Sequence, residues 1–245
     1  MAAGLRVLVT GFEPFPGAPV NPTEKLVAAL RAAPPVLDGM AAFRAEVLPV
    51  DYDAVGPRLS AIGRDFSPDV AIHFGLATEC AGFRLERLAR NRFEADRPDN
   101  AGILRAAGQV CTGPDTLPSG LPLEAIARRL AAMGLPVEWS DDAGGYLCNT
   151  VFMLSRAHAC DGFAPAMSGF VHVPLTGEGA GFPLDDAGLM AGAVAVVGEC
   201  VEEGQSAVGS RDFRPEADHL PDGPSLLPTA ALVRRDPEFQ LLRRR

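Results

Sequence analysis

Short β-branched runs alternate with helical patterns along most of this chain, and that alternation constrains its fold more than any other feature. Strands joined by helices run parallel, because each helical crossover returns the chain to the same end of the sheet. We therefore expect a three-layer α/β/α sandwich around a mostly parallel, mixed sheet. The expected strands are 5–10, 43–48, 69–76, 137–140 and 169–174, and the expected helices are 22–33, 52–66, 123–134, one led by Cys148, and 185–203.

The length and hydrophobic content fit one domain with a full-sized core. The chain has 245 residues, and 47% of them are hydrophobic. The periodic pattern ends near residue 204, and the chain then becomes rich in proline. We expect a single α/β domain over 1–204 and a C-terminal extension over 205–245 that is loosely ordered or packed on the surface.

Charge and cysteine content exclude several classes of protein. A net charge of −9 disfavours nucleic acids and anionic membranes as partners. No run is apolar enough for a transmembrane helix, and the first residues lack the basic region of a signal peptide. Five cysteines without Cys-x-x-Cys or zinc-type spacing indicate reduced thiols in a cytoplasmic protein. We expect no metal site and no cofactor.

The stretch AGGYLCNTVFML, residues 143–154, places Cys148 between a glycine pair and the start of a predicted helix. The free N–H groups and the dipole at a helix N-terminus stabilise a thiolate and can hold an oxyanion. Gly144 and Gly145 would let a substrate backbone approach closely. The pattern predicts a nucleophile, although it also fits a small core residue at a strand–helix turn. The other four cysteines lack such flanks.

A catalytic cysteine needs a base, and the chain has four histidines. His158 follows Cys148 by ten residues in the same predicted helix, about 15 Å along its axis, which is too far. His219 lies in the predicted extension. His73 and His172 each lie near the end of an apolar strand, where a hydrogen-bonded core histidine is also common. Spacing alone does not separate these two.

An acid that could orient the imidazole lies in residues 83–100, where five arginines accompany four acids. Most of these charges fit a surface segment with weak ion pairs. Glu86 differs, because Leu85 and Leu88 beside it indicate that this part is buried. A partly buried carboxylate is suited to fixing the tautomer and orientation of a catalytic histidine.

Four stretches together make the chain resemble the pyroglutamyl-peptidase I family, the pyrrolidone-carboxylate peptidases. They are VLVTGFEPF with the following NPT, ERLARN with PDNAG, AGGYLCN, and GFVHVP, and the likeness spans about residues 5 to 204. The resemblance implies a phosphorylase/hydrolase-like fold and a cytosolic cysteine peptidase with a Glu–Cys–His triad. It assigns the triad to Glu86, Cys148 and His172, and so favours His172 over His73.

The resemblance also implies the substrate site. Phe12 and Phe15 would flank a flat, neutral lactam ring that offers apolar faces and one amide edge. Gly144, Gly145 and Asn149 belong to the matching nucleophile turn and would bind substrate as well. The implied substrates are small peptides with an N-terminal pyroglutamate. Dimers and tetramers occur in the family, which implies a homodimer or a homotetramer, although the residues themselves indicate no assembly.

Several positions depart from the family pattern. Pro16-Gly17 replaces a glycine pair in the first loop, and Glu79-Cys80 replaces a Gly-Arg pair after the third strand. Asp96 stands where the family has an arginine near the oxyanion, so we expect Arg97 to supply that charge after a one-residue shift. These changes leave two other functions open: a related cysteine amidase acting on another cyclic or blocked amide, and a non-catalytic ligand-binding relative.

Overall fold

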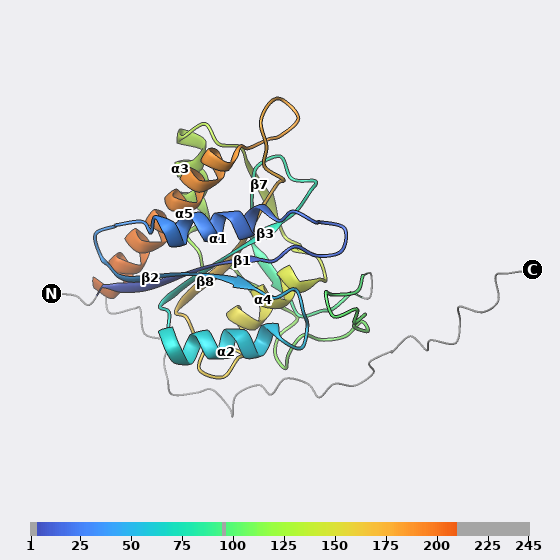
Figure 1. The fold of residues 1–245 in the computed structure, drawn as a ribbon. Helices are drawn as coiled ribbons and strands as arrows, with labels where there is room; N and C mark the ends of the chain where they lie inside the picture. Colours follow the sequence, from blue (N-terminus) through green and yellow to red (C-terminus); the bar gives the residue numbers. More distant parts are fainter. Residues whose placement is uncertain (1–3, 95–96, 210–245) are drawn as a thin grey trace, which may run out of the picture.

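A computed structural model describes residues 4–94 and 97–209 of the chain, and these form a six-stranded sheet between two helical layers (Figure 1). The predicted fold class is therefore confirmed. The sheet contains β1 (Leu5–Phe12), β2 (Met40–Leu48), β3 (Val70–Leu76), β4 (Phe83–Glu86), β7 (Val137–Ser140) and β8 (Met167–Val173), and a separate antiparallel pair contains β5 (Leu88–Arg90) and β6 (Thr116–Pro118).

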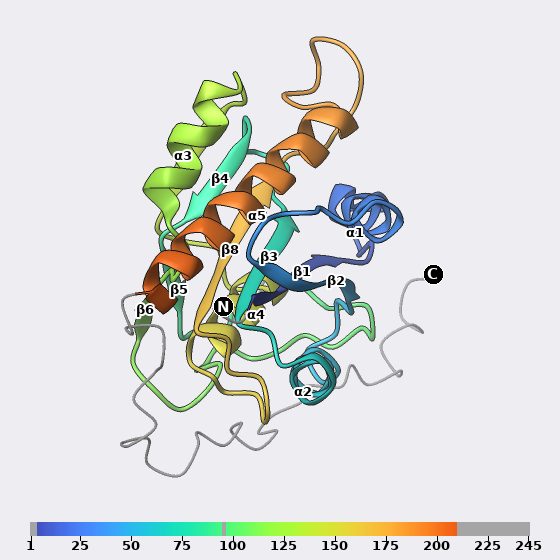
Figure 2. The same cartoon turned by 90° about the vertical axis from the view of Figure 1, so that its left-hand side faces the viewer.

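Helices cover both faces of the sheet because each helix has one apolar side. One face carries three helices, with α5 lying across the sheet between α3 and α1 (Figure 2). The other face carries the remaining two. The three are α1 (Pro22–Ala32), α3 (Leu123–Ala132) and α5 (Asp186–Gly209), and the two are α2 (Val55–Phe66) and α4 (Leu147–Arg156).

Each face of the sheet has its own hydrophobic core. Leu30 of α1, Leu130 of α3 and Val197 of α5 pack in one core, where all three are fully buried. Leu59 of α2 and Phe152 of α4 pack in the other. Burial of apolar area at roughly 25 cal/mol per Å² makes these two cores the main source of stability.

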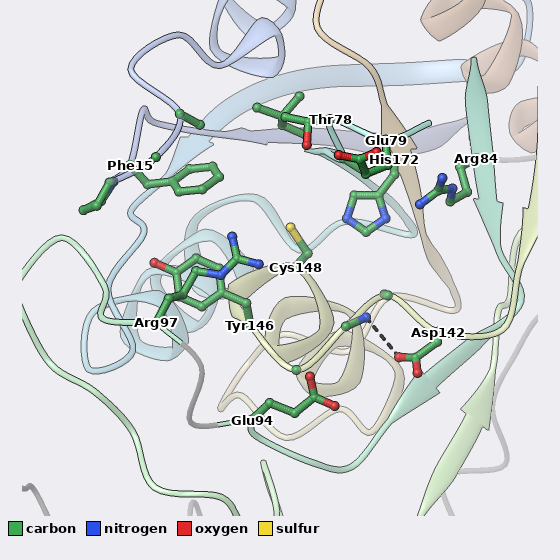
Figure 3. A pocket seen from close by; sticks show the side chains of 18 residues that line it. Phe15, Thr78, Glu79, Arg84, Glu94, Arg97, Asp142, Tyr146, Cys148 and His172 are labelled. Atoms are coloured by element: carbon green, nitrogen blue, oxygen red, sulfur yellow. Dashed lines mark hydrogen bonds between the residues drawn. The ribbon is translucent and has the colours of Figure 1, made fainter. Parts of the chain in front are cut away.

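The strand order is β2-β1-β3-β8-β4-β7, and it positions the site. The first four strands are parallel, whereas β4 runs antiparallel to β8 and parallel to β7. The carboxyl ends of β1, β3 and β8 therefore meet at one edge of the sheet, which is where ligands bind in open α/β sheets. The N-terminus of α4 lies at the same edge (Figure 3).

The structure corrects the expected elements in the middle and at the end of the chain. Residues 77–122, expected to be irregular, contain β4, β5 and β6. The domain boundary predicted at 204 falls inside α5, whose Gln205 side chain packs against the turn at Gly39. The rest of the predicted extension, 210–245, lies outside the described residues. Helix α4 ends at Arg156, so His158 follows the helix instead of lying within it.

Neither a membrane span nor a metal cluster is found in the described part of the chain. None of its helices is long and apolar enough to cross a membrane. No group of three or more His, Cys, Asp or Glu side chains within 4–94 and 97–209 is arranged to hold a metal ion.

Candidate active site

The turn before α4 presents Cys148 at the start of that helix. Tyr146 is the N-cap residue and makes no side-chain capping bond. The first N–H groups of α4 have no acceptor within the helix, so they are available to an anion beside the Cys148 sulfur. Gly144 has φ +80°, a left-handed conformation that favours glycine, and its N–H donates to Asp142 Oδ1 at 3.0 Å.

The nucleophile turn lies against a glycine of β3. A Cβ atom added to Gly75 would lie 2.9 Å from Cys148 Sγ and 2.7 Å from Phe170 Cζ. Gly75 is also the register partner of His172 in β8. The missing side chain therefore creates the space in which the sulfur meets the imidazole.

His172 lies between a buried carboxylate and the Cys148 sulfur. Its Nδ1 donates to Glu86 Oε1 at 2.7 Å, and the Cys148 side chain lies beside the ring, close enough to raise its pKa (Figure 3). Glu86 is fully buried at the end of β4, where antiparallel pairing with β8 sets it opposite Phe170. This short strand is what brings the carboxylate to the imidazole.

Charge around His172 makes the imidazole basic. Burial lowers the pKa of His172, but the Cys148 thiolate and the Glu86 carboxylate raise it, and the result is a pKa of about 9. At neutral pH the imidazole is therefore protonated, so it can act as an acid toward a leaving group. A positive imidazolium beside a cysteine sulfur also favours the thiolate, which is the nucleophilic form of the side chain.

His73 has different surroundings. It is fully buried in β3, its Nδ1 lies 2.8 Å from Thr10 Oγ1, and its ring stacks on Phe170 at 6.4 Å. Burial lowers the pKa of His73 to about 3. The side chain is a neutral core group, and it is absent from the pocket lining.

The other four cysteines are buried, whereas Cys148 is half-buried and reaches the pocket. Burial raises the pKa of Cys80 and Cys111 to about 11 and that of Cys160 to about 12. Burial also raises the pKa of Cys200. These four thiols stay protonated near neutral pH, so they are poor nucleophiles.

A cavity of about 410 Å³ opens in front of Cys148 (Figure 3). Phe15, Tyr146 and Arg97 lie on one side of the sulfur, and the two aromatic ring centroids are 5.9 Å apart. His172 and Arg84 lie on the other side. The cavity thus has an aromatic end and a charged end, with the sulfur between them.

The predicted substrate-binding residues occupy different places. Phe15, Gly144 and Gly145 line the cavity. Phe12 is 2% exposed and lines a smaller hollow, which Phe15 and Cys148 also line. Asn149 does not line the cavity, because its side chain bonds to the backbone of residues 90 and 92.

Arg97, one residue after Asp96 in the sequence, lines the cavity. Its guanidinium lies 4.7 Å from the centroid of the Tyr146 ring, and it points toward Cys148 (Figure 3). The Tyr146 hydroxyl donates to the Pro98 carbonyl at 3.0 Å, which holds this segment at the cavity. Asp96 itself lies outside the described residues.

Sequence reasoning assigned no role to Gly75 or Tyr146. Gly75 lies inside the run DVAIHFGL, where a glycine in an apolar strand is a signal for close approach of another group. Tyr146 stands two residues before the cysteine, but its contact with Phe15 comes from a loop 131 residues away in the sequence and leaves no local pattern.

A doubly covered α/β sheet with a cysteine, a histidine and a buried carboxylate at its carboxyl edge defines a class, the cysteine hydrolases of α/β fold. Comparison with known proteins identifies the group within it. Residues 5–189 match the family model described as pyroglutamyl peptidase. A pyrrolidone-carboxylate peptidase from Pyrococcus furiosus is 39% identical over 175 residues, which cover 71% of this chain and 83% of the relative.

Other relatives and solved structures agree. A pyrrolidone-carboxylate peptidase from Clavibacter michiganensis is 37% identical over 70% of this chain and 79% of its own. The crystal structure of the Pyrococcus furiosus pyrrolidone carboxyl peptidase superposes with a TM-score of 0.73 at 33% identity, over 80% of this chain and 98% of the other. That from Thermus thermophilus gives 0.69 at 33% identity, over 79% and 99%. The chain belongs to the pyroglutamyl peptidase family and is a cysteine peptidase.

Proposed function

We propose that this chain removes an N-terminal pyroglutamyl residue from peptides, with Cys148 as nucleophile, His172 as base and acid, and Glu86 as the residue that orients His172. The observation that carries the proposal is the arrangement of these three side chains. The Cys148 sulfur lies beside His172, and His172 Nδ1 lies 2.7 Å from Glu86 Oε1. The relatives' name, pyrrolidone-carboxylate peptidase, supports the substrate.

The mechanism follows from that contact chain. The thiolate of Cys148 attacks the carbonyl carbon that links pyroglutamate to the next residue. Backbone N–H groups at the start of α4 stabilise the oxyanion that forms. His172 then gives its proton to the leaving amine, and the bond from carbon to nitrogen breaks. The neutral imidazole then takes a proton from a water molecule, whose oxygen attacks the thioester carbon. The bond from carbon to sulfur breaks, pyroglutamate leaves, and the thiolate and the imidazolium are restored.

The aromatic end of the cavity suits the lactam ring. Phe15 and Tyr146 provide apolar faces at a ring separation of 5.9 Å, and Phe12 is buried at a small hollow that both of them also line. A neutral ring without a free ammonium group can enter there without the cost of desolvating a charge. Phe12 therefore supports the wall of this site, while Phe15 is the phenylalanine that contacts the ring.

Arg97 is proposed to support the oxyanion. Its guanidinium lies in the cavity over Tyr146 and points toward the sulfur (Figure 3). A cation there is attracted more strongly to the tetrahedral intermediate than to the neutral carbonyl, so it favours the transition state.

Hydrolysis of a pyroglutamyl-coumarin substrate tests the proposal. Wild type should release coumarin, Cys148→Ala should release none, and the matched control Cys80→Ala should keep its activity, because Cys80 is buried with a protonated thiol. Substantial turnover by Cys148→Ala would contradict the assignment. Fast stoichiometric alkylation of Cys148 at neutral pH should accompany turnover and would distinguish the enzyme from a ligand-binding relative.

Location and assembly remain predictions. Five free thiols in the structure fit the reducing cytoplasm. A homodimer or homotetramer is expected from the resemblance alone, and sedimentation analysis of the full chain would measure it.

A further inference from the structure

The charged end of the cavity holds one carboxylate that has no ion-pair partner among the described residues. We infer that this carboxylate, Glu79, makes the enzyme prefer peptides in which a positively charged residue follows the pyroglutamate. The inference rests on the proposed function, because it names the substrate class of the same site.

The position of the leaving residue follows from the geometry of His172. Its Nδ1 is held by Glu86, so Nε2 is the nitrogen that gives the proton to the leaving amine. The lactam ring occupies the aromatic end, at Phe15 and Tyr146. The residue after pyroglutamate must therefore lie on the His172 side of the sulfur, where Glu79 lines the cavity (Figure 3).

The turn that carries Glu79 is fixed to the catalytic strand. The Ala77 N–H donates to the Val173 carbonyl at 3.0 Å, one residue beyond His172, and the Cys80 N–H donates to the Ala77 carbonyl at 3.1 Å. Cys80 is 3% exposed and anchors the turn in the core. Glu79 is exposed, but its backbone is held beside His172.

The other two carboxylates of the cavity are already neutralised. Glu94 lies 2.8 Å from Arg92, and Asp142 lies 2.9 Å from the same guanidinium. Asp142 also lies 3.5 Å from Arg90. Within the described residues, Glu79 makes no hydrogen bond or ion pair, so its charge remains available to a substrate cation.

Arg84 lies at the same end and would repel a cation if it were unpaired. Its Nε is 2.9 Å from Glu138 Oε2, and Glu138 also accepts the Ala81 N–H at 2.9 Å. Arg84 is paired with Glu138 and His172 is paired with Glu86, which leaves Glu79 as the unpaired charge of this end within the described residues. The net charge of −9 on the whole chain adds a long-range attraction of the same sign.

Three matched peptides test the inference: pyroglutamyl-Arg-Ala-amide, pyroglutamyl-Gln-Ala-amide and pyroglutamyl-Glu-Ala-amide. The wild-type kcat/KM should follow the order Arg, Gln, Glu, with the Arg peptide about two- to fivefold above the Gln peptide at low salt, as expected for an exposed ion pair. The ratio should fall toward one at about 0.5 M salt, because screening weakens the attraction.

Variants separate Glu79 from the general charge of the protein. Glu79→Gln should bring the Arg-to-Gln ratio close to one, and Glu79→Arg should reverse the order. Glu124→Gln changes the net charge equally on the exposed side of α3 and should keep the wild-type ratio. Equal kcat/KM values for all three peptides, or a wild-type ratio in Glu79→Gln, would overturn this inference alone. Failure to hydrolyse any of the peptides would overturn the proposed function and this inference together.

Discussion

Two buried histidines lie in neighbouring parallel strands of one sheet, and the polar and charged groups around them differ. His73 of β3 pairs in register with Phe170, and His172 of β8 pairs with Gly75. The Thr10 hydroxyl and two aromatic rings surround His73. None of these groups carries a negative charge that would offset the cost of burying a protonated imidazole. His172 has a carboxylate and a thiolate, which overcome that cost. Both imidazoles are buried, so burial alone does not set their chemistry. The charges of the contacting groups decide whether a buried histidine is a neutral core residue or a catalytic base.

The largest expected difference concerns activity. His172→Ala should lower kcat by about 10⁴-fold, because the residue serves as both base and acid. His73→Ala should instead cost about 2–4 kcal/mol of unfolding free energy by leaving a cavity in the core. Coumarin release and urea unfolding measure the two effects. An inactive but stable His73→Ala, with an active His172→Ala, would reverse the assignment.

Glu86→Gln should make the surroundings of His172 more like those of His73. Without the carboxylate the pKa of His172 should fall from about 9, and kcat should drop by about 10³-fold, because an amide also stabilises the wrong tautomer. NMR titration of the imidazole measures the pKa, and Glu124→Gln is the matched control. An unchanged titration would show that Cys148 alone raises the pKa.

Arg97 is exposed and lines the cavity of the His172 site, so its removal should affect turnover more than folding. Arg97→Ala should lower kcat by about 10²-fold and leave KM nearly unchanged, as expected for a contact made in the transition state. Arg64, which pairs with Asp161 on the surface of α2, provides the control Arg64→Ala. An unchanged kcat in Arg97→Ala would leave the backbone N–H groups as the oxyanion donors.

Gly75 of β3 has no Cβ atom, and this absence leaves room for the Cys148 sulfur beside His172 of β8. The Cβ of Gly75→Ala would meet the Cys148 sulfur at 2.9 Å, so the sulfur must move away from His172. We expect kcat to fall by about 10²-fold, since small misplacements of reacting groups have effects of this size. Gly198→Ala, where an added Cβ meets nothing within 4 Å, is the control. Alkylation of Cys148 at the wild-type rate in Gly75→Ala would contradict this explanation.

The smallest expected effect is on stability, and it has opposite signs for the two histidines. The pKa of His73 lies below the ordinary 6.5, so its contribution is complete above pH 6.5 and is lost as the pH falls toward 3. The pKa of His172 lies above 6.5, so its contribution is complete below pH 6.5 and is lost as the pH rises through 9.

Urea unfolding between about pH 4 and pH 9 measures these contributions, each limited to about 1.4 kcal/mol per pH unit. His73→Gln should flatten the acid side of the stability curve and His172→Gln the alkaline side. Identical curves for the two variants would contradict the difference between the two sites.

Much of the fold could be predicted, because strong local patterns survive in it. Asn21 and Pro22 mark the start of α1, and the structure has Asn21 accepting the Thr23 N–H there. The strands β1, β3 and β8 are almost wholly buried, so their sequences consist mainly of apolar residues and can be recognised as strands. β4 escaped prediction because its four residues include two charged ones, and its burial depends on β7 and β8 beside it.

Within the site, the local pattern of residues was enough to place Cys148 at the start of a helix and after two glycines, because a turn and a helix start are local properties. It also placed a histidine near the end of each of two apolar strands. Only the tertiary structure decided between those histidines, since Glu86 reaches His172 through the antiparallel pairing of β4 with β8. The contacts of Gly75 with Cys148 and of Tyr146 with Phe15 likewise come only from the tertiary structure. Contacts between distant segments depend on strand order and register, which a local pattern of residues does not encode.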